Sequence, residues 1–314
     1  MHAVWQHTNI GGAATHPPAP LSPPPLQGKG GVVTRGGPGV GRGIALECAA
    51  QGARVVVNDL GGGPSGGGGD PALAESVVAE IRAAGGEAVA DAHSVADWDA
   101  AQRLVQRAMD TWGRIDGVVN NAGILSDAIF HKMSVEQFQA VLAVNLLGPF
   151  HVSRAAAPHM RERGAGAFVH MTSTSGLIGN LGQANYAASK LGLVGLSKSI
   201  AIDMARAGVR SNCIAPFAWT RLVGTIPEET PEQKRRVEGL KRLVPERVAP
   251  FTAALLSDGA KDVTGQVFGV RNNEIILFSQ PRPIRIAHTA EGWTPETVVE
   301  RVLPMMRADF HPLQ

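Results

Sequence analysis

The chain has 314 residues, of which 44% are hydrophobic and 18% charged, so it can bury a large core. Its formal net charge of +2 is too small a basic excess to predict a nucleic-acid partner. The cysteines and histidines show no metal-ligand spacing, and no apolar run approaches the ~20 residues of a membrane span. We therefore predict no metal and no membrane association. Without a signal-like start, a cytoplasmic location is expected.

The first segment, residues 1–27, is rich in proline and small residues and has no apolar period. Because proline lacks an amide donor and opposes helix formation, we predict a disordered or polyproline-like arm.

From residue 28 onward, short β-branched runs alternate with longer amphipathic stretches. This alternation predicts an α/β fold of the doubly wound Rossmann type, with a parallel seven-stranded sheet covered by helices on both faces. We predict that residues 28–270 form one domain. The predicted strands are 32–34, 54–58, 87–91, 117–119, 167–171, 209–214 and 266–270, and the predicted helices are 40–51, 72–84, 97–112, 134–162, 184–206 and 246–257.

Three segments interrupt the alternation. The glycine-rich run 61–69 is predicted to be a surface loop, and residues 217–245 form a long insertion before the next helix. Residues 271–314 are predicted to be an extension packed on the same domain, with a strand at 273–278 and a helix near 295–307.

A glycine-rich turn follows the first strand. Residues 34–41 read TRGGPGVG and lead into a helix, whose amino terminus suits a pyrophosphate. Asp59 closes the second strand 18 residues after Gly41, where a carboxylate can accept both ribose hydroxyls and repel the extra phosphate of NADP. The pattern predicts NAD as cofactor. The alternative is a tight structural turn with Asp59 as an ordinary loop acid.

The sequence places Asn145 within an otherwise apolar helical stretch. Such a buried amide needs polar partners. Taken alone, this favours a core residue that bends the helix over a functional one.

The clearest chemical pattern is Ser173, Tyr186 and Lys190. Tyr186 is the one tyrosine of the chain, and Lys190 lies four residues later on the same helix face. A free phenol titrates near ~10, and a neighbouring ammonium lowers that pKa. Ser173 ends the fifth strand, where its hydroxyl can hold a substrate oxygen.

The glycine turn, Asn120-Asn121-Ala122-Gly123, the mid-helix Asn145, the Ser173/Tyr186/Lys190 spacing and Asn212–Pro216 occur in one order. Over about residues 28–270 this set resembles the classical short-chain dehydrogenase/reductase family. The stretches 55–62, 179–193 and 293–298, with the glycine loop, are most similar to the (3R)-hydroxyacyl-CoA dehydrogenase part of peroxisomal multifunctional enzyme type 2 and its bacterial relatives.

The resemblance implies a role for each matching position. Tyr186 would be the general acid/base, Lys190 would lower its pKa and bind the nicotinamide ribose, Ser173 would orient the reacting oxygen, and Asn145 would hold a relay water. Asp59 and Leu60 would meet the adenosine ribose, Ser94 and Val95 the adenine, and residues 217–245 would form a substrate lid. The implied cofactor-binding residues are Thr34, Gly36, Gly39, Val40, Gly41, Asp59, Leu60, Ser94, Val95, Asn121, Ala122, Gly123, Tyr186, Lys190, Pro216 and Thr220.

The chain also departs from the family pattern. Arg35 replaces a glycine of the turn, where a side chain strains the backbone. His93 replaces an acid that faces adenine, and Phe217 replaces a glycine. Gly30, Gly31, Gly36 and Pro38 also fit a strand and turn poorly.

The expected activity is NAD-dependent oxidation of a secondary alcohol, a (3R)-3-hydroxyacyl-CoA, by a homodimer or homotetramer. One alternative is a dehydrogenase of steroids or other bulky alcohols, and another is a non-catalytic scaffold whose altered turn no longer binds cofactor. The basic run 234–247 is either a solvated helix face or a handle for the phosphates of coenzyme A.

Overall fold

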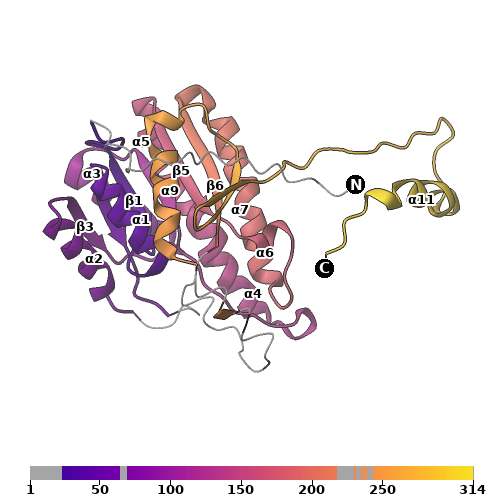
Figure 1. Cartoon of the computed structure of the whole chain (residues 1–314), viewed down its shortest axis with the longest axis horizontal. Coiled ribbons are helices and arrows are strands. Elements are labelled where there is room, and N and C mark those ends of the chain that lie inside the picture. Colours follow the sequence, from indigo (N-terminus) through magenta and orange to yellow (C-terminus); the bar gives the residue numbers. More distant parts are fainter. Residues whose placement is uncertain are drawn as a thin grey trace.

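The computed structural model describes residues 23–63, 69–217, 230, 235, 237, 238 and 243–313. Seven parallel strands form a twisted sheet, as predicted, and an eighth strand pairs antiparallel with the seventh (Figure 1). The strand order is β3-β2-β1-β4-β5-β6-β7-β8. The strands are β1 (Gly30–Thr34), β2 (Arg54–Asn58), β3 (Glu87–Asp91), β4 (Gly117–Asn120), β5 (Gly166–Met171), β6 (Val209–Phe217), β7 (Val267–Arg271) and β8 (Glu274–Leu277).

Helices cover both faces of the sheet. Alternate residues of a strand point to opposite sides, and here the residues on both sides are apolar and need to be buried. Val33, Val55 and Val57 belong to the core on one face, and Val32 and Val56 belong to the core on the other. The first face carries α1 (Gly39–Ala50), α2 (Ala72–Ala83) and α9 (Ala249–Leu256), and the second carries α3 (Trp98–Trp112), α5 (Gly148–Arg163) and α7 (Ala184–Asp203).

The stretch predicted as one long helix at 134–162 has an irregular middle. It consists of α4 (Val135–Leu142), a π-helical turn at Ala143–Leu147 and α5. The π-turn surrounds Asn145, whose side chain bonds to backbone outside the helix. By length and composition alone, Val135–Arg163 would be long enough to cross a bilayer, but it packs against α3, α7 and the sheet.

The structure corrects the boundary of the predicted disordered arm. Residues 23–27 are placed, and the Leu26 side chain is only 2% exposed within the core beside α1. The Leu26 amide donates to the Gln51 carbonyl, and the Gly28 amide donates to Gly52. Burial of the Leu26 side chain and its backbone hydrogen bond thus hold this part of the segment against the core, despite the neighbouring prolines. Residues 1–22 lie outside the described part of the chain.

The structure differs from the prediction that the whole extension packs on the domain. Strand β8 joins the sheet, but the chain beyond it extends away from the body of the molecule (Figure 1). No described residue in 279–313 is buried, and Pro281 and Pro283 deny the segment amide donors. The helix predicted near 295–307 is present, with an irregular middle: α10 (Pro295–Thr297), a π-turn at Val298–Val302 and α11 (Leu303–Met306) follow one another without a break.

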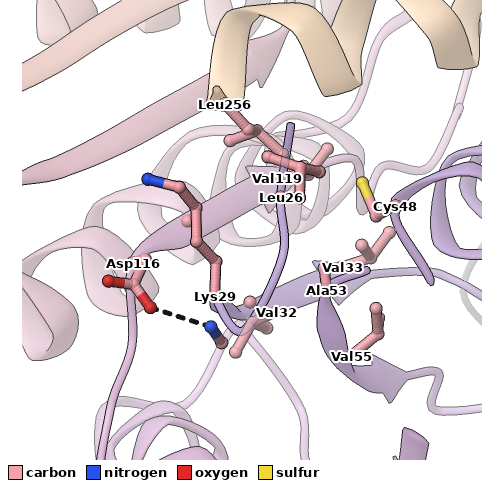
Figure 2. Close-up of a pocket in the computed structure, with 13 residues that line it drawn as sticks. Leu26, Lys29, Val32, Val33, Cys48, Ala53, Val55, Asp116, Val119 and Leu256 are labelled. Atoms are coloured by element: carbon pink, nitrogen blue, oxygen red, sulfur yellow. Dashed lines mark hydrogen bonds between the residues drawn. The ribbon is translucent and has the colours of Figure 1, made fainter. Parts of the chain in front are cut away.

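The glycines at the start of β1 serve close packing, which corrects the expectation that they fit a strand poorly. A Cβ added to Gly30 would lie 2.7 Å from the Arg114 carbonyl oxygen. The Gly30 amide donates to Asp116 Oδ2 at 2.8 Å. The dashed line at Asp116 in Figure 2 marks this bond. The small apolar pocket drawn there is lined by Leu26, Cys48, Leu256 and the beginnings of β1 and β4.

A row of hydrogen-bonded, buried polar side chains crosses the sheet at His170. The Nδ1 atom of His170 lies 3.1 Å from the side-chain nitrogen of Asn120, and its Nε2 atom lies 3.1 Å from Ser211 Oγ. Asn120 also donates to Ser153, and Ser211 contacts Ser197. Burial, together with the charge of Lys190, lowers the pKa of His170 from 6.5 to about 3. The folded ring is therefore neutral down to strongly acidic pH.

His170 is expected to make the fold sensitive to acid. Between pH 6.5 and about 3, the unfolded histidine binds a proton that the folded ring excludes, so stability falls as pH falls through this window. We expect a loss of ~1 kcal/mol per pH unit from this residue. Urea unfolding at pH 7 and pH 5 checks it, because His170→Gln should remove that part of the slope. Equal slopes in both proteins would contradict the assignment.

Candidate active site

The candidate site lies at the carboxyl ends of the parallel strands, where the strand order reverses between β1 and β4. Doubly wound sheets bind ligands in the crevice at this point. The pocket of Figure 2 lies elsewhere, because the starts of β1 and β4 line it. The site is therefore built from the turns that follow the strands.

The glycine-rich turn after β1 leaves no room for side chains. A Cβ on Gly41 would lie 2.0 Å from the Arg35 carbonyl oxygen, and one on Gly36 would lie 2.8 Å from Val57 Cγ1. Gly39 has a φ of +63°. Pro38 caps α1 without a side-chain hydrogen bond, and the first turn of α1 has no acidic residue. The helix start can therefore receive an anion, and this cradle fits a dinucleotide.

Asp59 faces this turn from the end of β2, as predicted. Its side chain is 4% exposed, and its Oδ2 accepts from the Gly37 amide at 2.9 Å while Oδ1 accepts from Gly61 at 2.7 Å. The carboxylate thus holds the glycine turn against the loop after β2. Leu60 beside it is exposed.

The predicted adenine end lies after β3. Val95 is buried, and the Ser94 hydroxyl accepts from the Ala96 amide at 3.3 Å. His93 Nδ1 lies 2.8 Å from Asp91 Oδ2, and Asp91 also accepts from Asn58. The side chain that replaces the family's acid is thus tied to an acid two residues earlier.

The loop after β4 is fastened to the glycine turn. Thr34 Oγ1 accepts from the Asn121 and Ala122 amides, each at 2.9 Å. The Asn121 side-chain amide donates to the carbonyls of Thr34 at 3.2 Å and Arg35 at 3.1 Å. The guanidinium of Arg35 donates to the carbonyl of Gly123. These bonds hold the two sides of the crevice together.

Ser173, Tyr186 and Lys190 come together as the sequence predicts. Ser173 caps the short helix α6 (Thr174–Leu177) after β5, and its hydroxyl hydrogen-bonds the Tyr186 phenol. Tyr186 lies in the first turn of α7, and Lys190 follows one turn later. The Lys190 ammonium is 5.6 Å from the phenol ring centre and donates to the Met171 carbonyl at 2.7 Å.

The pKa values differ from the expectation that Lys190 dominates. Burial is the largest effect on the phenol and raises the pKa of Tyr186 to about 12. The Ser173 hydrogen bond and the charge of Arg35 lower this pKa, and the charge of Asp127 raises it. Burial also lowers the pKa of Lys190 to about 8. In this structure desolvation outweighs the charge effect, so the phenol is protonated at neutral pH.

Asn145 is buried and fully engaged. Its Oδ1 accepts from the Ile124 amide at 2.8 Å, and its Nδ2 donates to the Ile124 carbonyl at 3.0 Å. A Cβ added to Gly123 would lie 3.5 Å from Asn145 Oδ1 and 3.6 Å from the Lys190 ammonium. The helix-bending role favoured for a lone asparagine is realised, and the residue also lies beside Lys190. The water relay stays a prediction.

Two further residues that the sequence did not single out hold the start of α7, the helix that carries Tyr186. Asn185 is buried; its Oδ1 accepts from the Tyr186 amide at 2.7 Å and its Nδ2 donates to the Ser126 carbonyl at 2.8 Å. Gln183 donates to Asp127 at 2.8 Å. In the sequence, the signal for Asn185 is an asparagine that directly precedes Tyr186 at the start of a predicted helix.

The nicotinamide end of the predicted site is described only in part. Pro216 and Phe217 end β6, and the Arg271 guanidinium lies 6.0 Å from the Phe217 ring centre. Thr220, most of the proposed lid, and the basic residues Lys234, Arg236, Lys241 and Arg242 lie outside the described residues. Those predictions stay predictions.

Comparison with known proteins supports the pattern. The family model described as enoyl-(acyl carrier protein) reductase matches residues 36–271. A Mycobacterium tuberculosis protein named as a short-chain type dehydrogenase/reductase is 49% identical over 278 residues, or 86% of this chain and 94% of that protein. Mouse peroxisomal multifunctional enzyme type 2 is 44% identical over 78% of this chain, which spans 32% of that larger protein.

A 3-oxoacyl-[acyl-carrier-protein] reductase of Staphylococcus aureus is 36% identical over 77% of this chain and 96% of its own length. The crystal structure of a short-chain dehydrogenase from Mycobacterium avium superposes with a TM-score of 0.79 at 38% identity, covering 92% of this chain and 97% of that one. The chain belongs to the short-chain dehydrogenase/reductase family of oxidoreductases, which use nicotinamide cofactors.

Proposed function

We propose that this protein oxidises a (3R)-3-hydroxyacyl-CoA to the 3-ketoacyl-CoA with NAD⁺, in the cytoplasm. The observation that carries the oxidoreductase chemistry is the Lys190 ammonium 5.6 Å from the Tyr186 ring centre, with Ser173 just after β5 close enough to the phenol to lower its pKa. It lies at the edge of the sheet that also holds the glycine turn and Asp59.

The residues divide the proton chemistry among them. A bound nicotinamide dinucleotide would accept the hydride. Ser173 orients the substrate oxygen, and the Tyr186 oxygen takes the alcohol proton. Because the phenol is protonated at neutral pH, Tyr186 must first lose a proton before it can act as a base. Lys190 and Arg35 both place positive charge near the resulting phenolate.

The preference for NAD rests on Asp59. Its carboxylate is held at the glycine turn by two backbone amides, so it cannot turn away from an approaching ribose. A 2′-phosphate there would place two negative groups close together, which is unfavourable.

The acyl substrate is supported by apolar side chains around Ser173 and Tyr186. The Ala128 amide donates to the Gly182 carbonyl at 2.9 Å and joins the loops after β4 and α6. Phe130, Ile178 and Leu181 on these loops are exposed and can cover an acyl chain. The name of the Staphylococcus relative, a 3-oxoacyl-[acyl-carrier-protein] reductase, points to acyl chemistry as well.

Cofactor choice tests the proposal. The value of kcat/KM should be at least ~100-fold higher with NAD⁺ than with NADP⁺. The substitution Asp59→Ala should lower this ratio. Asp97→Ala serves as the matched control, since Asp97 is also engaged with a backbone amide, at the start of α3. It should leave the ratio unchanged. A wild-type preference for NADP⁺ would refute the NAD assignment.

A further inference from the structure

Arg35 has an unusual backbone at the glycine turn. It has a φ of +49°, a left-handed conformation that side chains rarely adopt. Its carbonyl accepts from Asn121, and the Gly36 amide donates to Asn58 at 2.9 Å. The surrounding backbone thus holds the residue in this conformation and fixes the direction in which its side chain leaves the turn.

The side chain crosses the crevice between β1 and β4. Its guanidinium donates to the carbonyl of Gly123. Gly123 adjoins Lys190, because a Cβ placed on it would lie 3.6 Å from the ammonium. The charge of Arg35 also lowers the pKa of both Tyr186 and Lys190. The guanidinium therefore lies beside Gly123 and Lys190, at the reacting end of the site.

We propose that Arg35 is a specificity-determining residue that favours the reduced cofactor over the oxidised one. The inference rests on nicotinamide dinucleotide binding at this site. The nicotinamide ring of the oxidised cofactor carries a positive charge, and that of the reduced cofactor is neutral. A guanidinium at the reacting end therefore repels only the oxidised form.

The charge effect can be separated from strain in the turn. The two oxidation states share the same adenosine and diphosphate, so relaxing the turn or losing a contact to phosphate changes both affinities by the same factor. Arg35→Gly relaxes the backbone, and we expect it to raise affinity for both forms. Only the charge changes the ratio of the two dissociation constants.

The experiment is calorimetric titration of NAD⁺, NADH and ADP-ribose into wild type, Arg35→Gln and Arg35→Lys. Both variants keep a Cβ and the same positive φ, so they share the backbone strain, and they differ in charge. ADP-ribose has no nicotinamide and reports the effects common to both states. Thermal unfolding confirms that each variant is folded.

In Arg35→Gln, the ratio of Kd for NAD⁺ to Kd for NADH should fall by about tenfold, allowing for solvent screening. In Arg35→Lys it should stay within about twofold of wild type. An unchanged ratio in Arg35→Gln, or an equal fall in Arg35→Lys, overturns the inference and leaves the proposed function intact. A wild-type chain that binds neither dinucleotide overturns both.

Discussion

Replacing Tyr186 by phenylalanine is expected to lower kcat for alcohol oxidation by on the order of 10³-fold. The change removes the oxygen that exchanges a proton with the substrate and preserves the ring. Because the ring and its backbone partner Asn185 remain, cofactor affinity should change by less than about threefold. Steady-state rates and calorimetric titration with the dinucleotide measure the two effects separately.

The chain offers a spectroscopic control for this variant. Tyr186 is its one tyrosine, so the ultraviolet absorbance of tyrosinate reports this phenol alone. In the cofactor-free protein it should appear near pH 12, the pKa that burial produces, and it should be missing from Tyr186→Phe. Retention of a tenth or more of wild-type kcat in the variant would remove Tyr186 from the mechanism.

Adding one methyl group at Gly41 is expected to damage both the fold and cofactor binding. The new Cβ would lie 2.0 Å from the Arg35 carbonyl oxygen and 2.7 Å from the Asn121 side chain, so the turn and the loop after β4 must separate. Such overpacking costs ~1–3 kcal/mol of the free energy of unfolding. Dinucleotide affinity should fall about tenfold or more, because the displaced atoms form the cradle at the start of α1.

Gly195 provides the matched control. It lies in α7, and a Cβ added there meets nothing within 4 Å. Gly195→Ala should stabilise the protein by ~0.5–1 kcal/mol through helix propensity and leave dinucleotide affinity unchanged. Urea unfolding and calorimetric titration on both variants check the pair. If Gly41→Ala binds the cofactor as well as Gly195→Ala does, the glycine turn is not the cofactor cradle.

The sheet and the positions of the site residues were predictable because short-range patterns determine them. The alternation of β-branched runs with amphipathic stretches indicated all seven parallel strands, and parallel strands bring the ends of β1, β4 and β5 to one edge. This places Ser173 beside Tyr186. The strand β8 was also predicted. Its antiparallel pairing with β7 was not, because it depends on the turn between the two strands, which the periodicity of the sequence does not encode.

Features that depend on distant contacts could not be predicted from the sequence. Leu26 is buried in the core cluster that includes Ile44 and Cys48 of α1, and its proline-rich neighbours in the sequence give no sign of this burial. The raised pKa of Tyr186 depends on how deeply α7 buries the phenol, and the YxxxK spacing reports only its distance from Lys190. The direction of the Arg35 side chain follows from Asn121 and Gly123, which lie after a different strand.

The central proposal, oxidation of a 3-hydroxyacyl-CoA with NAD⁺, is tested most directly by following NADH absorbance. The wild-type chain is mixed with NAD⁺ and either a (3R)-3-hydroxyacyl-CoA or a steroid alcohol, with Tyr186→Phe as the blank. We predict NADH formation from the acyl-CoA by wild type alone. Turnover of the steroid alcohol without turnover of the acyl-CoA, or no NADH from either substrate, would contradict the proposal.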